Sequence, residues 1–223
     1  MTKTFLRGAV LAASLALAAL PAFATQPFSA PYQANYMGMN ATGRMAIESA
    51  GNGQWRYTLE IRNQLADLVQ TTVFDEDGGV LRPLSGSDTN KLLIKKSSKK
   101  ATYDWAKGVA TWSGDVKPDR AGPVKLQKGD LDALLVNIAI ARDAVAGKPL
   151  RYRLVENGKA RDLSYAIAGK EAITVNGKSQ QATKVVSTSG DKKTTIWVVA
   201  GVPVPVRIMQ AAGNDTIDLR IAQ

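Results

Sequence analysis

The chain has 223 residues, with 29 Lys and Arg residues against 19 Asp and Glu residues, and a formal net charge of +10. It contains neither cysteine nor histidine. These absences exclude disulfides, thiol nucleophiles, His-ligated metals and a Ser-His-Asp triad. We therefore expect no catalytic residue, no metal site and no cofactor, in a chain long enough for one domain with a sizeable core.

Residues 1–24 have the regions of a secretory signal peptide. Lys3 and Arg7 precede the apolar run Gly8–Leu20, and small residues follow at Ala22 and Ala24. The run is shorter than the roughly 20 residues that a spanning helix needs. We expect cleavage after Ala24 and a periplasmic protein comprising residues 25–223, with no later segment apolar and long enough to cross a membrane. The alternative is a buried N-terminal helix.

The next segments alternate between apolar and polar residues, which is typical of half-buried antiparallel strands. The alternating runs are Trp55–Arg62, Leu150–Leu154, Val204–Met209 and Ile217–Ile221. Pro205 places its run at a sheet edge or bulge. Counting all such runs gives about a dozen strands at the spacing of sandwiches and barrels.

Two Asn-Gly pairs mark the tightest turns. Asn157-Gly158 and Asn176-Gly177 lie between alternating runs, and both residues of a type I′ turn must adopt positive φ, which Asn and Gly do most readily. Each pair therefore predicts a β-hairpin.

One segment has helical periodicity instead. Asp130 is the expected N-cap of a helix in which Leu131, Leu134, Leu135, Ile138 and Val145 share a face, and Gly147 and Pro149 end it. We predict a single domain, mostly β, with one antiparallel curved sheet forming a barrel or half-barrel. Curling hides the edges of a long meander, and the single helix covers one mouth or face.

Four local patterns, in this order, resemble one family of exported bacterial proteins. They are Tyr32–Tyr36, Phe74–Pro83, Gly129–Leu135, and Ile196-Trp197 followed by Pro203–Ile208. Together they resemble the domain of unknown function 3108 family, over nearly the whole chain after residue 24. The resemblance implies a fold and a location, and no activity. By analogy, such curved sheets look like lipocalin-type or lipoprotein-carrier half-barrels.

A basic cluster lies near the middle of the chain. Its members are Lys91, Lys95, Lys96, Lys99, Lys100 and Lys107. They suit contact with anionic lipid head groups at a membrane surface. The alternative is a solvated hairpin whose lysines block edge-to-edge aggregation. Because an exported protein seldom meets nucleic acid, we expect no such partner.

Aromatic residues on predicted strands supply the candidate ligand site. If the sheet encloses a cavity, Tyr57, Trp105, Trp112 and Trp197 would line it, and Arg207 would stand at its rim. A surface position with an extended side chain is the alternative for Arg207.

Three functions remain open. The first is a periplasmic binding or carrier protein for an apolar or lipid-like ligand, with the lysines near the mouth favouring an anionic head group. The second is a non-catalytic interaction scaffold of the cell envelope. The third, which has least support, is a carboxylate-based hydrolase of envelope polymers using a pair such as Asp130 and Asp132, although a helix start already explains both residues. The oligomeric state stays open.

Overall fold

The computed structural model describes residues 24–36, 38–93, 95–213 and 215–222. Strands dominate this part of the chain, and α1 (Ala133–Val145) is its only α-helix. The strands are β1 (Phe28–Tyr36), β2 (Met39–Gly51), β3 (Gln54–Arg62), β4 (Ala66–Asp77), β5 (Val80–Leu92), β6 (Lys95–Asp104), β7 (Val109–Gly114), β8 (Val124–Lys125), β9 (Asp130–Leu131), β10 (Arg151–Glu156), β11 (Lys159–Ser164), β12 (Ala166–Val175), β13 (Lys178–Ser189), β14 (Lys192–Val198), β15 (Arg207–Ala212) and β16 (Asp215–Ile221).

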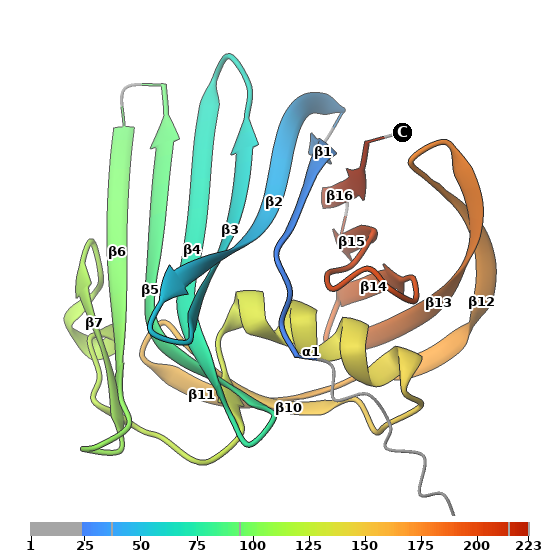
Figure 1. Ribbon diagram of the computed structural model, residues 1–223. Helices are drawn as coiled ribbons and strands as arrows, with labels where there is room; N and C mark the ends of the chain where they lie inside the picture. The colour runs from blue at the N-terminus through green and yellow to red at the C-terminus, as the bar shows by residue number, and fades with distance from the viewer. Residues whose placement is uncertain (1–23, 37, 94, 214, 223) are drawn as a thin grey trace, which may run out of the picture.

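Thirteen of these strands form one curved antiparallel sheet, in the order β12-β13-β14-β15-β16-β1-β2-β3-β4-β5-β6-β7-β8. The sheet is a meander except at its centre, where β1 pairs with β16 and joins the two halves of the chain, with Tyr32 opposite Ile221. Its edge strands, β12 and β8, do not pair with each other, so the sheet is a half-barrel rather than a closed barrel (Figure 1).

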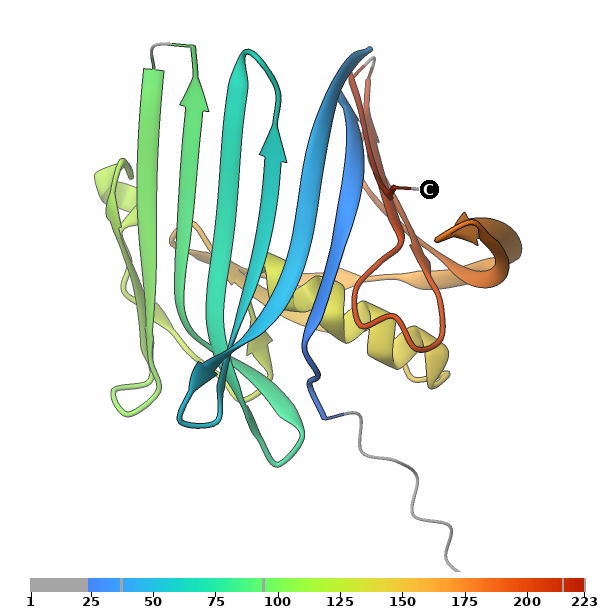
Figure 2. The ribbon, with the colours of Figure 1, turned by 45° about the horizontal axis from the view of Figure 1, so that its top comes forward.

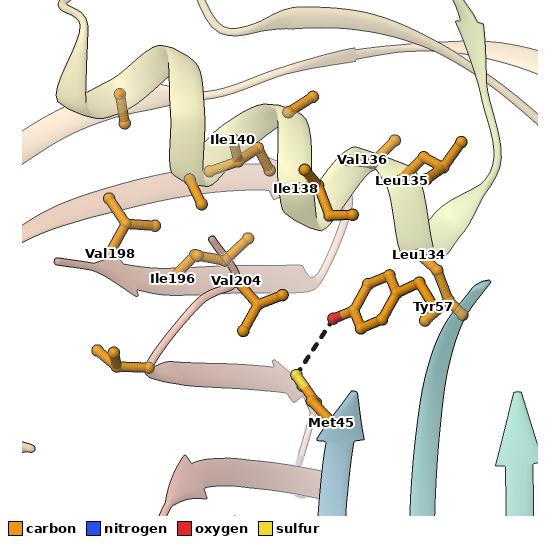
Figure 3. Packing of buried hydrophobic residues seen from close by; sticks show 14 of the residues in the cluster. Met45, Tyr57, Leu134, Leu135, Val136, Ile138, Ile140, Ile196, Val198 and Val204 are labelled. Atoms are coloured by element: carbon orange, nitrogen blue, oxygen red, sulfur yellow. Dashed lines mark hydrogen bonds between the residues drawn. The ribbon is translucent and has the colours of Figure 1, made fainter. Parts of the chain in front are cut away.

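Helix α1 lies against the concave face of this sheet, across its lower part (Figures 1 and 2). Its side chains are apolar almost all round, which is typical of a helix buried on several sides. Leu135 and Ile140 are fully buried and pack in one cluster with Tyr57 of β3 and Ile196 of β14. In this cluster the Tyr57 hydroxyl lies 3.2 Å from Met45 Sδ (Figure 3). The lower half of the half-barrel is therefore filled by the helix.

A second, three-stranded sheet, β11-β10-β9, closes the lower end next to the helix. The Tyr103 hydroxyl of β6 donates a hydrogen bond of 3.1 Å to the Val155 carbonyl of β10. Around this contact a smaller apolar cluster forms, which includes Trp112 and Leu126. The small sheet thus places the Asn157-Gly158 turn beside Tyr103 and Trp112 of this cluster.

The structure confirms the mostly β fold, the curved antiparallel sheet and the single helix. Both Asn-Gly hairpins are present, with Asn157 at φ 48° and Asn176 at φ 51°. Within the described residues, no helix has the length and apolar character needed to span a membrane. The predicted signal peptide lies outside the described residues, apart from Ala24.

Two predicted boundaries were wrong. The N-cap is Asp132, whose carboxylate accepts from the Leu135 amide at 2.9 Å, because residues 130–131 pair with β10 as strand β9. The strand predicted from Val204 begins at Arg207, since Pro203 and Pro205 have no N–H to donate to a ladder. The segment before Arg207 is still buried, with Val204 and Val206 fully enclosed.

Candidate functional site

Side chains on the concave face of β3–β7 form rows that run across the strands. At the level of the helix, the row is Tyr57, Thr72, Gly86, Ala101 and Trp112. The next row towards the open end is Leu59, Gln70, Asp88 and Lys99, and the row beyond it is Ile61, Leu68, Asn90 and Ser97. Only the first row is covered by α1. The other two rows form the floor of an open groove.

This groove has a volume of about 290 Å³ and is amphipathic across its width. Leu59, Ile61 and Leu68, from β3 and β4, make an apolar wall, and all three are only half-buried. Asp88, Asn90, Ser97 and Lys99 line the opposite side, on β5 and β6. A hydrophobic wall facing a few polar groups is the usual composition of a small-ligand site, and the volume is close to the lower limit of about 300 Å³ for such sites.

The groove continues inward to a small cavity of about 40 Å³, which shares Gln70, Asp88 and Lys99 with it. The inner cavity is bounded by Trp112, by the start of α1 at Asp132, and by Glu156 and Asn157 of the small sheet. Lys99 Nζ donates to Asn157 Oδ1 at 3.3 Å, which ties the sheet wall to the Asn-Gly turn. Three acidic residues, Asp88, Asp132 and Glu156, and two lysines, Lys99 and Lys100, therefore line the inner end.

Burial perturbs two of these carboxylates. Desolvation raises the pKa of Asp132 to about 6, against hydrogen bonds from the Thr72 hydroxyl and the Leu135 amide that lower it. Desolvation also raises the pKa of Glu156, with a further contribution from Asp88. Burial therefore favours the protonated, neutral form of both carboxyl groups.

One polar atom of the groove lacks a partner. Asn90 Oδ1 is buried and makes no hydrogen bond within the described part of the chain. A buried amide oxygen without a donor costs free energy, which a bound N–H or O–H group would recover. In the same part of the chain, no group of three or more acidic side chains is arranged to hold a metal ion.

The predicted ligand-site aromatics do not come together. Tyr57 is fully buried beneath the helix, and Trp112 borders the inner cavity, with its ring edge-on to Tyr103 at 6.3 Å. Trp105 lies in the turn after β6 at the lower end, where its Nε1 donates to the Pro83 carbonyl at 2.6 Å. Of these three, only Trp112 faces the groove system.

Trp197 and Arg207 lie on the other face of the sheet. Trp197 alternates with Ile196 and Val198, which pack towards the helix, so its ring is on the convex side. The ring is nevertheless buried, because Arg207 stacks over it at 4.8 Å and Glu171 accepts from its Nε1 at 2.5 Å. Both side chains are engaged in this polar cluster on the outer face, away from the groove.

The predicted lysines divide between the two faces of β5 and β6. Lys95 and Lys99 share the concave face with the groove, whereas Lys91, Lys96 and Lys100 are on the convex face. Lys91 and Lys96 stand directly opposite each other across the two strands. Lys99 is thus the predicted lysine that lines both the groove and the inner cavity on the concave face.

The two aspartates at the helix start have structural partners. Asp130 Oδ2 accepts from Arg153 Nη1 at 2.6 Å and from the Gln127 amide at 2.8 Å. Asp132 caps α1 and accepts from Thr72. The geometry therefore gives both carboxylates a part in joining α1 to the sheets.

Sequence reasoning missed the residues that build the groove. Alternation places Leu59 and Ile61 on one face of a half-buried strand without showing that this face is open, and it does not single out Asp88, Asn90 or Ser97. The signal that could have found them is the loss of apolar character on the inward face of residues 86–99, where small and polar residues stand at every second position. Such a strand has one face that no core covers.

The chain is similar to the crystal structure of a β-barrel-like protein of domain of unknown function DUF1849 from Brucella abortus, with a TM-score of 0.49 and 13% identity over 88% of this chain and 96% of that chain. No curated protein matches the sequence. A family model described as "Protein of unknown function (DUF3108)" matches residues 31–220, and the chain therefore belongs to the DUF3108 family.

Proposed function

We propose that the protein binds, and carries through the periplasm, an elongated amphipathic molecule of lipid-like character, held in the concave groove. The observation that carries the proposal is the groove itself. Half-buried Leu59, Ile61 and Leu68 stand on a concave face that the helix leaves open. An apolar chain lying along the strands would cover this wall, and each buried CH₂ contributes about 0.8 kcal/mol.

The polar side of the groove indicates what the rest of the ligand carries. Asn90 Oδ1 lacks a donor, and Asp88 and Glu156 lie farther in. These acceptors favour hydroxyl, amide or amine groups along the polar side of the groove and at its inner end. The anionic head group expected from the lysines then faces outward, towards Lys95 at the open end. Such a ligand is zwitterionic, or anionic with hydrogen-bond donors.

The test is native mass spectrometry and organic extraction of protein purified from its own cells without detergent. A co-purifying amphipathic molecule is expected, and Leu68→Arg should abolish it by placing a charge on the apolar wall. Val69→Arg is the matched control, because Val69 is the next residue of β4 and its side chain points to the convex face. Loss of the ligand in both variants, or in neither, would argue against the groove.

The second candidate is the interaction scaffold, which the filled lower half of the half-barrel favours. The inner cavity of about 40 Å³ holds little more than one or two waters. The scaffold function replaces the carrier function if no molecule co-purifies and added lysophospholipid leaves the fluorescence emission of Trp112 unchanged. Trp112→Phe identifies the contribution of this residue to the emission, because Trp112 borders the inner cavity and Trp105 and Trp197 lie elsewhere.

A further inference from the structure

The open end of the half-barrel carries an unusual concentration of exposed apolar side chains. Eight large hydrophobic residues of the described chain are well exposed, and six of them lie at this end. We call this end the upper rim and define it by the six residues, which are Tyr36, Met39, Leu65, Leu92, Leu93 and Ile217. They belong to the ends of the β1–β2, β3–β4 and β5–β6 hairpins and to β16, which lie along one edge in Figure 2.

The six residues form neighbouring groups. Tyr36 stands directly opposite both Met39 and Ile217 in the sheet register. The β3–β4 and β5–β6 hairpin ends are joined by a hydrogen bond of 2.9 Å from the Leu93 amide to the Leu65 carbonyl. Isolated exposed leucines are ordinary on a protein surface, whereas adjacent apolar residues on one edge indicate an interaction site.

Leu93 has an unfavourable backbone conformation for its residue type. Four non-glycine residues of the described chain have positive φ, and three of them, Asn52, Asn157 and Asn176, are asparagines followed by glycine. The fourth is Leu93, at φ 49°, with its side chain 66% exposed. A leucine at such a position costs conformational free energy and gains no core packing in return. Its side chain is therefore free to contact something outside the chain.

Charge distinguishes the upper rim as well. Lys91, Lys95 and Lys96 are exposed next to Leu92 and Leu93, and none of them is in an ion pair within the described ranges. Lys91 and Lys96 face each other directly, and Asp67 of β4 stands opposite Lys91 on its other side, so two lysines share one acidic neighbour in this row. At the opposite rim, the hairpin ends are Asn52-Gly53 and Gly78-Gly79, with the acidic residues Asp75, Glu76 and Asp77 alongside.

We propose that the upper rim docks the protein on an anionic lipid bilayer, with the leucine-bearing hairpin ends entering the interface and Lys91, Lys95 and Lys96 contacting lipid phosphates. Apolar side chains flanked by lysines are the combination that binds such surfaces, because apolar burial and attraction to anionic lipids add. The proposal rests on the proposed function only for its purpose: docking would turn the open end of the groove towards the lipid source.

The experiment measures binding of the purified protein to vesicles of phosphatidylglycerol and phosphatidylcholine, and to phosphatidylcholine alone. Binding is expected only with phosphatidylglycerol and should weaken with salt. Changing Lys91, Lys95 and Lys96 together to Gln should lower affinity about 100-fold, on the basis of about one kcal/mol per lysine. The control changes Lys159, Lys170 and Lys178, which are equally exposed and lie away from the rim, and should have little effect.

Leu93→Asn separates docking from folding. Asparagine adopts positive φ more readily than leucine, so this variant should be as stable as the original protein or more stable. Its vesicle affinity should nevertheless fall about tenfold, because a leucine no longer enters the interface. Unchanged affinity in Leu93→Asn, or equal binding to both vesicle types, would overturn the proposal.

A fluorescent label gives the orientation. Because the chain has no cysteine, Gln64→Cys at the upper rim and Ala106→Cys in the turn at the opposite end can each carry one environment-sensitive dye. Only the label at residue 64 should shift to the blue with vesicles. A blue shift of the label at residue 106 would contradict docking. So would a dimer, detected by sedimentation, that forms through the upper rim and prevents vesicle binding. None of these readouts depends on a ligand in the groove, so failure here leaves the proposed function untouched.

Discussion

A single carboxylate, that of Asp132, joins the helix, the curved sheet and the inner cavity. It caps α1 through the Leu135 amide, accepts from Thr72 of β4, and lies 3.9 Å from where a Cβ on Gly86 would stand. Gly86 is therefore the neighbour of this carboxylate on β5. Because the group is buried, the same position that satisfies the helix end also raises its pKa to about 6.

Folding stability should consequently depend on pH through Asp132. The folded protein holds this proton more tightly than the unfolded chain, so the contribution is fully present below pH 4 and is lost as pH rises through 6. A carboxyl pKa raised from its ordinary value to about 6 corresponds to about 3 kcal/mol of folding free energy. Asp132→Asn keeps the cap and can still hydrogen-bond Thr72, so its unfolding free energy should not fall over this range.

Urea unfolding from pH 4 to pH 7.5 checks this prediction. The difference between Asp132→Asn and the original protein should grow with pH, whereas Asp119→Asn, at an exposed side chain, should run parallel to the original. Parallel curves for Asp132→Asn would show that the carboxylate is not the source of the pH dependence.

The residue that caps the helix could not be chosen from the sequence. Asp130 and Asp132 both precede an apolar run, and either can accept from an amide three residues later. The difference arises because Arg153 of β10 pairs with Asp130 and draws residues 130–131 into a strand. Arg153 and Asp130 are distant in the chain, and the periodicity of a helix cannot predict a contact between such residues. Trp197 was misplaced for a similar reason, since polar neighbours bury it on the outer face.

Hairpins were the elements best predicted, because Asn-Gly turns depend on local backbone preference alone. Alternation also identified which residues share a face of β3. It could not say where the covering helix ends, so Leu59 and Ile61 were grouped with Tyr57 although only Tyr57 lies under α1. The groove exists because α1 crosses the lower part of the strands and leaves their upper part uncovered.

The two Asn-Gly turns should differ in their tolerance of a side chain. Gly158 and Gly177 both have positive φ, at 70° and 71°. A Cβ on Gly158 would lie 2.4 Å from the Arg120 carbonyl oxygen, whereas one on Gly177 would meet nothing within 4 Å. Gly177→Ala should cost about 1–2 kcal/mol for the backbone conformation. Gly158→Ala should cost more, because the small sheet must also move away from residues 118–120.

Chemical denaturation of the two variants decides this prediction. A larger loss of unfolding free energy in Gly158→Ala is expected, with Gly177→Ala as the matched turn. Equal losses would mean that the Asn157-Gly158 turn is not held against Arg120 in solution.

At the scale of the whole molecule, the residue that follows the predicted cleavage site lies beside a carboxylate. The Thr25 amide donates to Glu76 Oε2 at 3.3 Å, and Glu76 is also paired with Arg142 of α1 at 3.4 Å. Cleavage after Ala24 would place a new ammonium group beside this carboxylate. Intact mass measurement of periplasmic protein should give Thr25 as the first residue. Soluble periplasmic material that retains Met1 would contradict the assignment.

The central claim is that the open half of the half-barrel holds an amphipathic molecule. A crystal structure of protein purified from its own cells without detergent tests it most directly. We expect elongated density along Leu59, Ile61 and Leu68, with a donor within hydrogen-bonding distance of Asn90 Oδ1. A groove that holds only ordered water, in protein from which extraction also yields no lipid, would contradict the claim.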